Sequence, residues 1–145
     1  MYRIREVDAS DDEIADTIRQ FNKDADAHFP ELEDYELEGE HCYWWLAYLD
    51  KEPVAFAGMV PSVRYAQAGY LKRSGVSAAH RGQGLQLRFF KVRERKARQI
   101  GWTMLISETT NTIYSANNFI RAGYKLFEPK ERWAFQTSLY WKKEL

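Results

Sequence analysis

The sequence predicts a single α/β domain of the α+β kind over residues 1–145, in which helices flank a mixed, mostly antiparallel central sheet. Short segments rich in aromatic and β-branched residues alternate with segments of helical periodicity. Hydrophobic residues make up 45% of the 145 residues, which suits one well-filled core and leaves no room for a second domain. No repeat and no linker-like stretch divides the chain.

The N-terminal part predicts a strand followed by a helix. Residues 1–7 alternate between polar and apolar side chains, as a half-buried strand does. Ser10 stands three residues before Glu13, the spacing at which each side chain can cap the other's backbone N–H, so we expect a helix to begin there. The apolar stripe of this helix would consist of Ile14, Ile18 and Phe21.

The middle of the chain predicts three strands. Residues 43–49 and 54–63 are rich in aromatic and β-branched residues, and residues 50–53 between them have turn chemistry, which predicts an antiparallel hairpin. A third strand is expected over residues 70–78. Gly75 within it marks either a bulge or a close approach of the backbone to another part of the chain.

The strongest helical pattern follows the glycines of residues 82–84 and runs to Ile100, with Gly101 placed to end it. Its expected apolar face comprises Leu85, Phe89, Val92 and Ile100. The remaining expected elements are a strand over residues 103–107, a helix through Ala122 capped by Asn111 or Thr112 and ended by Gly123, and strands over residues 124–127 and 133–141.

Positive and negative side chains balance at 21 each, so the global charge attracts the protein neither to nucleic acid nor to an anionic membrane. One face of the long helix carries Arg88, Lys91, Arg95 and Arg98, which form either a solvated surface or a site for an acidic partner. A nucleic-acid-binding domain is the weaker hypothesis, because the chain lacks a second basic element. We expect neither nucleic acid nor membrane as a partner.

Cysteine usage and hydropathy indicate a cytoplasmic protein. Cys42 is the single cysteine and cannot form an internal disulfide, which fits a reducing compartment. We interpret it as a packed side chain among aromatic neighbours, the alternative being a nucleophile. Residues 1–7 lack the continuous apolar stretch of a signal peptide, and no apolar run approaches the roughly 20 residues that span a bilayer.

Residues 80–84, His-Arg-Gly-Gln-Gly, connect an expected strand to the long helix and form a candidate anion site. Glycines let backbone N–H groups approach an anion, and a helix start adds unpaired donors and the positive end of its dipole. Arg81 adds a fixed positive charge. The alternative is a glycine turn that only reverses the chain. The loop lacks the Gly-Lys-Ser/Thr of a P-loop, and it follows several strands, whereas a dinucleotide-binding fold places it after the first.

Two segments resemble motifs of the GNAT superfamily of N-acetyltransferases. Residues 76–85, VSAAHRGQGL, are similar to its Arg-Gly-x-Gly coenzyme A motif, and residues 119–124, FIRAGY, are similar to its helix-ending Gly-Phe/Tyr. The resemblance implies a GNAT-like fold and an enzyme that transfers an acetyl (acyl) group from acetyl-CoA to a primary amine by direct attack, without a metal. A non-catalytic acyl-CoA-binding module of the same fold is the alternative.

The same resemblance implies which residues hold coenzyme A. Backbone N–H groups over residues 82–87 would bind the pyrophosphate, and the backbone of Val76 and Ser77 would pair with the pantetheine arm. Asn111 would either hydrogen-bond the pantetheine or cap the following helix. Gln86 departs from the Gly or Ala usual in the family. The expected coenzyme A residues are Val76, Ser77, Arg81, Gly82, Gln83, Gly84, Leu85, Gln86, Leu87 and Asn111.

Catalysis requires a group that accepts a proton, because an amine with a pKa of about 10.4 is mostly protonated near neutral pH and cannot attack a thioester. Glu108, at the end of an expected strand, is the candidate base, acting directly or through water; the alternative is an exposed carboxylate. His80 is a weaker candidate that we expect to shape the loop.

Many members of the family carry a Tyr, four residues before the final glycine of the second motif, that protonates the departing thiolate. This chain has Phe119 there, which has no proton to give. Ser115 and Tyr114 are the candidate replacements, and solvent is a third.

The sequence leaves the acceptor open between a small-molecule amine and a peptide amine. The acidic residues over 31–40 either line the entry for a cationic amine or are simply solvated. The aromatic final strand could pair across a homodimer.

Overall fold

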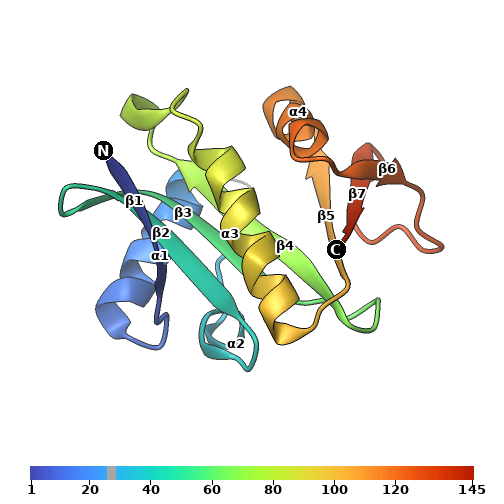
Figure 1. Ribbon diagram of the computed structural model, residues 1–145, viewed down its shortest axis with the longest axis horizontal. Coiled ribbons are helices and arrows are strands. Elements are labelled where there is room, and N and C mark those ends of the chain that lie inside the picture. Colours follow the sequence, from blue (N-terminus) through green and yellow to red (C-terminus); the bar gives the residue numbers. More distant parts are fainter. Residues whose placement is uncertain (26–28) are drawn as a thin grey trace. The chain divides into compact units, whose positions relative to one another are not determined.

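The computed structural model describes residues 1–25 and 29–145 (Figure 1). Its elements are β1 (Tyr2–Val7), α1 (Asp12–Ala25), α2 (Asp34–Glu38), β2 (Tyr43–Leu49), β3 (Glu52–Pro61), β4 (Ala68–Val76), the 3-10 helix η1 (Ala78–His80), α3 (Leu85–Ile100), β5 (Met104–Thr110), α4 (Ile113–Arg121), β6 (Lys125–Phe127) and β7 (Ser138–Glu144). The strands pair in the order β1-β2-β3-β4-β5-β7-β6, with β4 and β5 parallel. The pairs β1–β2, β2–β3, β5–β7 and β6–β7 are antiparallel, so the predicted mixed, mostly antiparallel sheet flanked by helices is confirmed.

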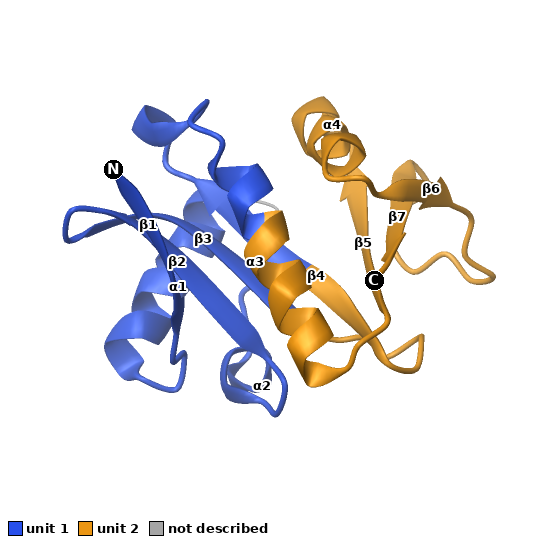
Figure 2. Cartoon of the chain, viewed as in Figure 1, with its two compact units in different colours: residues 1–60, 72–89 blue, residues 61–71, 90–145 orange. Residues whose placement is uncertain are grey.

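The chain divides into two compact units (Figure 2). Unit 1 comprises residues 1–60 and 72–89, and unit 2 comprises residues 61–71 and 90–145. Strand β4 and helix α3 each contribute residues to both units. Among the described residues, no helix combines the length and the apolar composition needed to cross a membrane.

Helix α1 in unit 1 has a different cap from the predicted one. The reciprocal cap between Ser10 and Glu13 is wrong, because Asp11 holds the capping position and its Oδ2 accepts the backbone N–H of Ile14 at 3.1 Å. Asp8 engages Ser10 instead: its Oδ1 accepts the Ser10 N–H at 3.0 Å and the Ser10 hydroxyl at 2.6 Å. Asp11 therefore caps the helix, and Asp8 stabilises the turn that precedes it.

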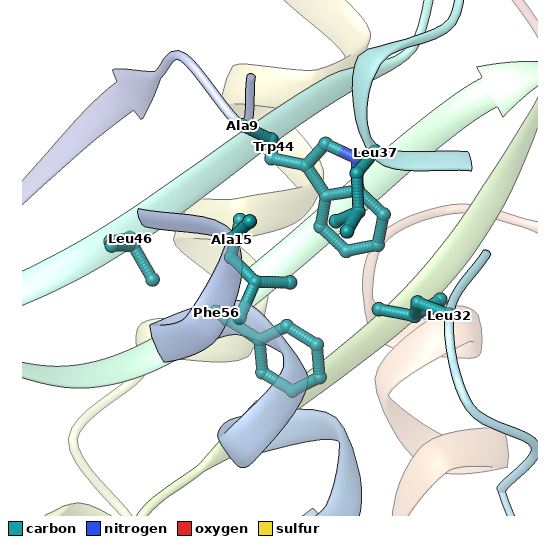
Figure 3. Packing of buried hydrophobic residues seen from close by; sticks show 8 residues of the cluster. Ala9, Ala15, Leu32, Leu37, Trp44, Leu46 and Phe56 are labelled. Carbon is teal, nitrogen blue, oxygen red and sulfur yellow. The ribbon is translucent and has the colours of Figure 1, made fainter. Parts of the chain in front are cut away.

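The core of unit 1 lies where α1 and α2 pack against β2 and β3 (Figure 3). Trp44, which is 1% exposed, stacks on Phe56 with 6.3 Å between ring centroids, and its indole N–H donates to the Glu36 carbonyl at 2.9 Å. Phe56 also stacks on Phe21 of α1 at 5.8 Å, so the predicted apolar stripe does face the sheet. Gly58 makes room for the indole, because a Cβ built there would lie 2.4 Å from Trp44 Cζ3.

Gly75 in β4 also belongs to unit 1 and allows a close approach, one of its two predicted roles. A Cβ at this position would lie 2.9 Å from the Cβ of Ala25 and 3.1 Å from Cε1 of Phe56. The end of α1 can therefore pack directly on the β4 backbone.

Unit 2 has an aromatic core around α4. The ring of Phe119 lies 4.9 Å from Phe90, 5.2 Å from Tyr124 and 5.6 Å from Trp141, measured between centroids. Burial raises the pKa of Tyr124, and the charge of Glu94 adds to this effect. The Tyr124 hydroxyl stays protonated and donates to Glu94 Oε2 at 3.1 Å.

Helix α3 buries two charged side chains in its second half, where the sequence predicted a continuous apolar face. Val92 and Ile100 are only half-buried, whereas Arg93 and Glu94 are 2% and 6% exposed. Lys143 of β7 donates to Glu94 Oε1 at 2.9 Å, and burial lowers the pKa of Arg93 to about 10. These partners come from distant segments, so helical periodicity alone could not reveal them.

Each strand from β3 to β7 begins or ends at residues other than those predicted, and in β5 and β7 the difference bears on Glu108 or on the loop beside it. Strand β5 continues to Thr110, which places Glu108 inside the strand and not after it. Strand β7 begins at Ser138, so the alternating pattern over residues 133–137 belongs to the preceding loop. Arg132 Nη2 donates to the Ser138 carbonyl at 2.7 Å and holds this loop against the start of the strand.

We expect Gly58→Ala to lower the free energy of unfolding by about 1–3 kcal/mol, because the added methyl group overlaps the Trp44 ring and forces it to shift. Urea denaturation measures the loss. In a Trp44→Phe background the indole atoms that the methyl group meets, Cε3, Cζ3 and Cη2, are absent. The same substitution should then lower the free energy of unfolding by clearly less. An equal loss in both backgrounds would contradict this packing.

Candidate functional site

The loop between η1 and α3 in unit 1 has the conformation of an anion-binding turn. Gly82 and Gly84 both adopt φ = 78°, a left-handed conformation that favours glycine. No heavy atom lies within 4 Å of a Cβ built at either position, apart from the chain neighbours, so the space beside the backbone is open. A ligand can therefore approach the main chain directly over residues 82–84.

The start of α3 presents backbone donors. The hydrogen bond from the Arg88 N–H to the Gly84 carbonyl, at 3.2 Å, is the first of the helical series, so the N–H groups of Leu85, Gln86 and Leu87 have no helical acceptor. The first turn of α3, all of which is described, contains no acidic side chain. Donors and dipole together favour a negative group here.

Arg81 and His80 are hydrogen-bonded to two different strands of unit 1, β4 and β1. The Arg81 Nε donates to the Val76 carbonyl at 3.2 Å, which holds an exposed guanidinium at the end of β4. The His80 Nδ1 and the Tyr2 hydroxyl lie 3.0 Å apart and share a hydrogen bond. Arg81 can pair with an anion, whereas the contact of His80 with β1 supports a role in shaping the loop.

The backbone at the end of β4 is only partly free. The Ser77 N–H donates to the Val54 carbonyl of β3 at 2.8 Å, so it is engaged within unit 1. Val76 is the last residue of β4, and its carbonyl accepts the bond from Arg81 described above. Of the two expected backbone partners for a ligand, Ser77 therefore has its N–H engaged, and the Val76 N–H stays the candidate donor.

The residues present fit a pyrophosphate. The donors of Leu85, Gln86 and Leu87, the open backbone of residues 82–84 and the cation of Arg81 converge on one end of one helix. A diphosphate takes several hydrogen bonds from N–H donors and a positive charge, and this set supplies both. Gln86 is half-buried, so its larger side chain fits the first turn of α3 without filling the space over the glycines.

Glu108 of unit 2 accepts a hydrogen bond on each of its carboxylate oxygens. The Tyr70 hydroxyl donates to its Oε2, and the Trp133 indole N–H donates to its Oε1, each at 2.5 Å. The side chain is half-buried. Each carboxylate oxygen has two lone pairs, so each can still accept a proton or a further hydrogen bond. The expected alternative, an exposed carboxylate, is wrong.

The partners of Glu108, Tyr70 and Trp133, were not among the predicted site residues. They lie 38 and 25 residues away from Glu108 along the chain, and the alternating pattern around Trp133 indicated a strand. Tyr70 lies on β4, where it is aligned with Ile106 of β5, two residues before Glu108. The parallel pairing of β4 with β5 brings it near, and no local sequence signal predicts that pairing.

The candidates on and before α4 differ in exposure. Tyr114 is 84% exposed, Ser115 is half-buried, and Phe119 is 8% exposed within the aromatic core. Asn111 has φ = 55°, a conformation that Asn tolerates better than most residues. Thr112 occupies the helix N-cap position, so the alternative role of Asn111 as N-cap is wrong.

The acidic stretch after α1 is partly neutralised within unit 1. Asp34 pairs with Arg19, and Glu36 pairs with Lys72 at 2.7 Å. Burial alone would raise the pKa of Glu36, but hydrogen bonds and the Lys72 charge bring it below its ordinary value.

Burial, together with the charge of Glu36, raises the pKa of the Cys42 thiol, which supports a packed side chain over a nucleophile.

No group of three or more His, Cys, Asp or Glu side chains within residues 1–25 and 29–145 is placed to hold a metal ion.

The model of the acetyltransferase (GNAT) family matches residues 6–124. No curated protein matches the chain. The fold is similar to that of an Elizabethkingia anophelis GNAT family acetyltransferase with acetyl-CoA bound, with TM-score 0.74, 18% identity, and 99% and 98% of the two chains covered. It is also similar to a Bacillus subtilis acetyltransferase in complex with CoA, with TM-score 0.75, 14% identity, and 100% and 99% covered. A Desulfovibrio desulfuricans protein assigned to the same family gives TM-score 0.79 at 16% identity, with 99% of both chains covered.

We expect Gly84→Glu to abolish coenzyme A binding, because a side chain would fill the open space and its carboxylate would enter the anion site. Titration calorimetry measures the binding, and circular dichroism checks the fold. Gly101→Glu is the matched control, since Gly101 also has positive φ and open space but ends the same helix. It should keep its affinity; unchanged affinity in Gly84→Glu would place the phosphates elsewhere.

Proposed function

This chain belongs to the GNAT acetyltransferase family, and we propose that it transfers an acetyl group from acetyl-CoA to a primary amine by direct attack. The observation that carries the proposal is the set of open backbone donors at the start of α3, over residues 82–87. Such a set matches the pyrophosphate of coenzyme A, and two structures of similar fold contain CoA or acetyl-CoA. Acetyl-CoA would supply the acyl group as a thioester.

The geometry of unit 1 supports the cofactor-binding roles that we propose. The N–H groups of Leu85, Gln86 and Leu87 would bind the pyrophosphate together with Arg81. The Val76 N–H would donate to the thioester oxygen, on which negative charge develops as the amine attacks. Asn111, in unit 2, stays a candidate for binding the pantetheine arm.

Glu108 would accept the proton that the amine loses. The amine lone pair attacks the carbonyl carbon, the carbon–sulfur bond breaks, and the sulfur leaves as a thiolate that needs a proton. Phe119 cannot supply this proton, so Ser115, Tyr114 or solvent would do so. Ser115 is half-buried and Tyr114 is mostly exposed, which favours Ser115 of the two side chains.

We propose a small-molecule or peptide amine as the acceptor. The ion pairs of Asp34 and Glu36 reduce the negative charge of the acidic stretch, so it gives little support to a strongly cationic acceptor. A cytoplasmic location is part of the proposal, because Cys42 has no partner for an internal disulfide and acetyl-CoA is an intracellular metabolite.

A non-catalytic acyl-CoA-binding module is the second candidate. The observation that favours it is the packing of Phe119 between aromatic rings, which leaves no proton donor at the position where many members of the family have one. Both candidates require coenzyme A binding, so only turnover separates them.

We expect coenzyme A to raise the melting temperature, since a ligand that binds only the folded state stabilises it. With acetyl-CoA and a panel of primary amines, thiol release should depend on the amine. Glu108→Gln should reduce this rate roughly 10²- to 10⁴-fold, with little change in coenzyme A affinity. Binding without amine-dependent thiol release would favour the non-catalytic module, and full activity of Glu108→Gln would exclude Glu108 as the base.

The replacement acid can be identified by removing single hydroxyl groups. If Ser115 is the donor, Ser115→Ala should reduce turnover by roughly 10²-fold or more, while Tyr114→Phe should have little effect. If solvent protonates the thiolate, both variants should keep their turnover. Phe119→Tyr restores a hydroxyl, and we expect at most a modest gain because the aromatic core was not shaped to orient it. A large loss in Tyr114→Phe alone would transfer the role to Tyr114.

A further inference from the structure

Glu108 in unit 2 is held by two neutral donors that come from different parts of the chain. Tyr70 lies on β4, and Trp133 lies in the loop between β6 and β7. A glutamate side chain has three rotatable bonds and would otherwise sample several rotamers. With one donor on each oxygen, the carboxylate group is fixed in both position and orientation.

The loop that carries Trp133 is built independently of Glu108. Arg132 donates two hydrogen bonds from Nη1 to the Glu128 carboxylate, at 2.8 and 2.9 Å, and Nη2 donates to the carbonyls of Gln136 and Ser138 at 3.0 and 2.7 Å. The Ala134 N–H donates to the Tyr140 hydroxyl at 2.9 Å. These bonds tie both ends of the loop to each other and to β7.

The indole ring of Trp133 also packs against two neighbouring side chains. Its centroid lies 4.5 Å from that of Tyr140 in a T-shaped arrangement, and the guanidinium carbon of Arg64 lies 4.6 Å over the ring. Neither contact involves the indole N–H. The ring orientation is therefore set by packing, and the N–H is directed at Glu108 as a result.

We propose that Trp133, with Tyr70, is a positioning residue for Glu108: the loop between β6 and β7 fixes the direction in which the carboxylate accepts the proton of the amine. This inference rests on the proposed function, in which Glu108 is the base. Proton transfer needs heavy atoms within about 2.6–3.2 Å, directly or through one water, so a fixed carboxylate reacts more often than a rotating one. Trp133 itself exchanges no proton with the substrate.

The test is Trp133→Phe, which keeps an aromatic ring against Tyr140 and Arg64 and removes the N–H donor. We expect kcat to fall roughly 10- to 100-fold, with the KM for acetyl-CoA unchanged. In a Glu108→Gln background the same substitution should cause no further loss, because the group that it positions is already inactive. A purely structural role would give losses that add.

Trp141→Phe is the matched control. The Trp141 indole N–H donates to Thr109 Oγ1 at 3.0 Å, so it bonds to the neighbouring β5 residue and not to Glu108. This variant also loses one indole donor in unit 2, and it should keep kcat while losing stability. An unchanged kcat in Trp133→Phe, or the same loss of kcat in both tryptophan variants, would overturn the proposal.

An NMR measurement tests the hydrogen bond from Trp133 to Glu108 independently of enzymatic activity. The indole N–H resonance of Trp133, assigned by its absence in Trp133→Phe, should lie downfield and move upfield in Glu108→Gln. If the wild-type protein acetylates no amine but this shift occurs, the proposed function fails while the positioning contact stands. If the resonance does not respond to Glu108→Gln, the contact is absent and the proposal fails whatever the activity.

Discussion

The start of α3 imposes the constraint on which the candidate ligand site depends. A helix leaves its first N–H groups without carbonyl partners, and here those of Leu85, Gln86 and Leu87 follow a turn with two residues in the left-handed conformation. Glycine at residues 82 and 84 permits the turn and keeps side chains away from the donors. The end of β4 and the tether of Arg81 to Val76 direct the chain into this turn. The candidate anion site is therefore a consequence of backbone geometry, to which one side chain adds charge.

Two carboxylates inside unit 2 accept hydrogen bonds from residues that are distant in the sequence. Glu94 of α3 accepts hydrogen bonds from Lys143 and Tyr124, which satisfies a carboxylate that burial would otherwise destabilise. Glu108 of β5 accepts from a strand and a loop, in the same manner. The first arrangement joins α3 to β7 and to the segment after α4. The second leaves lone pairs available at a half-buried carboxylate, which is what proton transfer requires.

The departure from the family at Phe119 has a packing explanation. Its ring contacts Phe90, Tyr124 and Trp141, so the position contributes to the core of unit 2. Stacked and T-shaped aromatic pairs stabilise such a core beyond the area that they bury. A hydroxyl there would need its own partner among these rings. Phe119 thus contributes a ring to the aromatic core of unit 2 and offers no proton donor.

The sequence by itself determined the order of the elements, the fold class, the glycine turn before α3 and the family resemblance. These features are encoded locally: glycines at residues 82 and 84 permit the turn, periodicity defines α3, and alternation defines most strands. The tertiary structure decided which side chains meet. Asp11 replaces Ser10 as the cap of α1, Arg93 and Glu94 are buried, and residues 133–137 form a loop. The partners of Glu108 also became visible only through the parallel pairing of β4 with β5 and the loop held by Arg132. Contacts between residues far apart in the chain depend on strand order and packing, which no local pattern records.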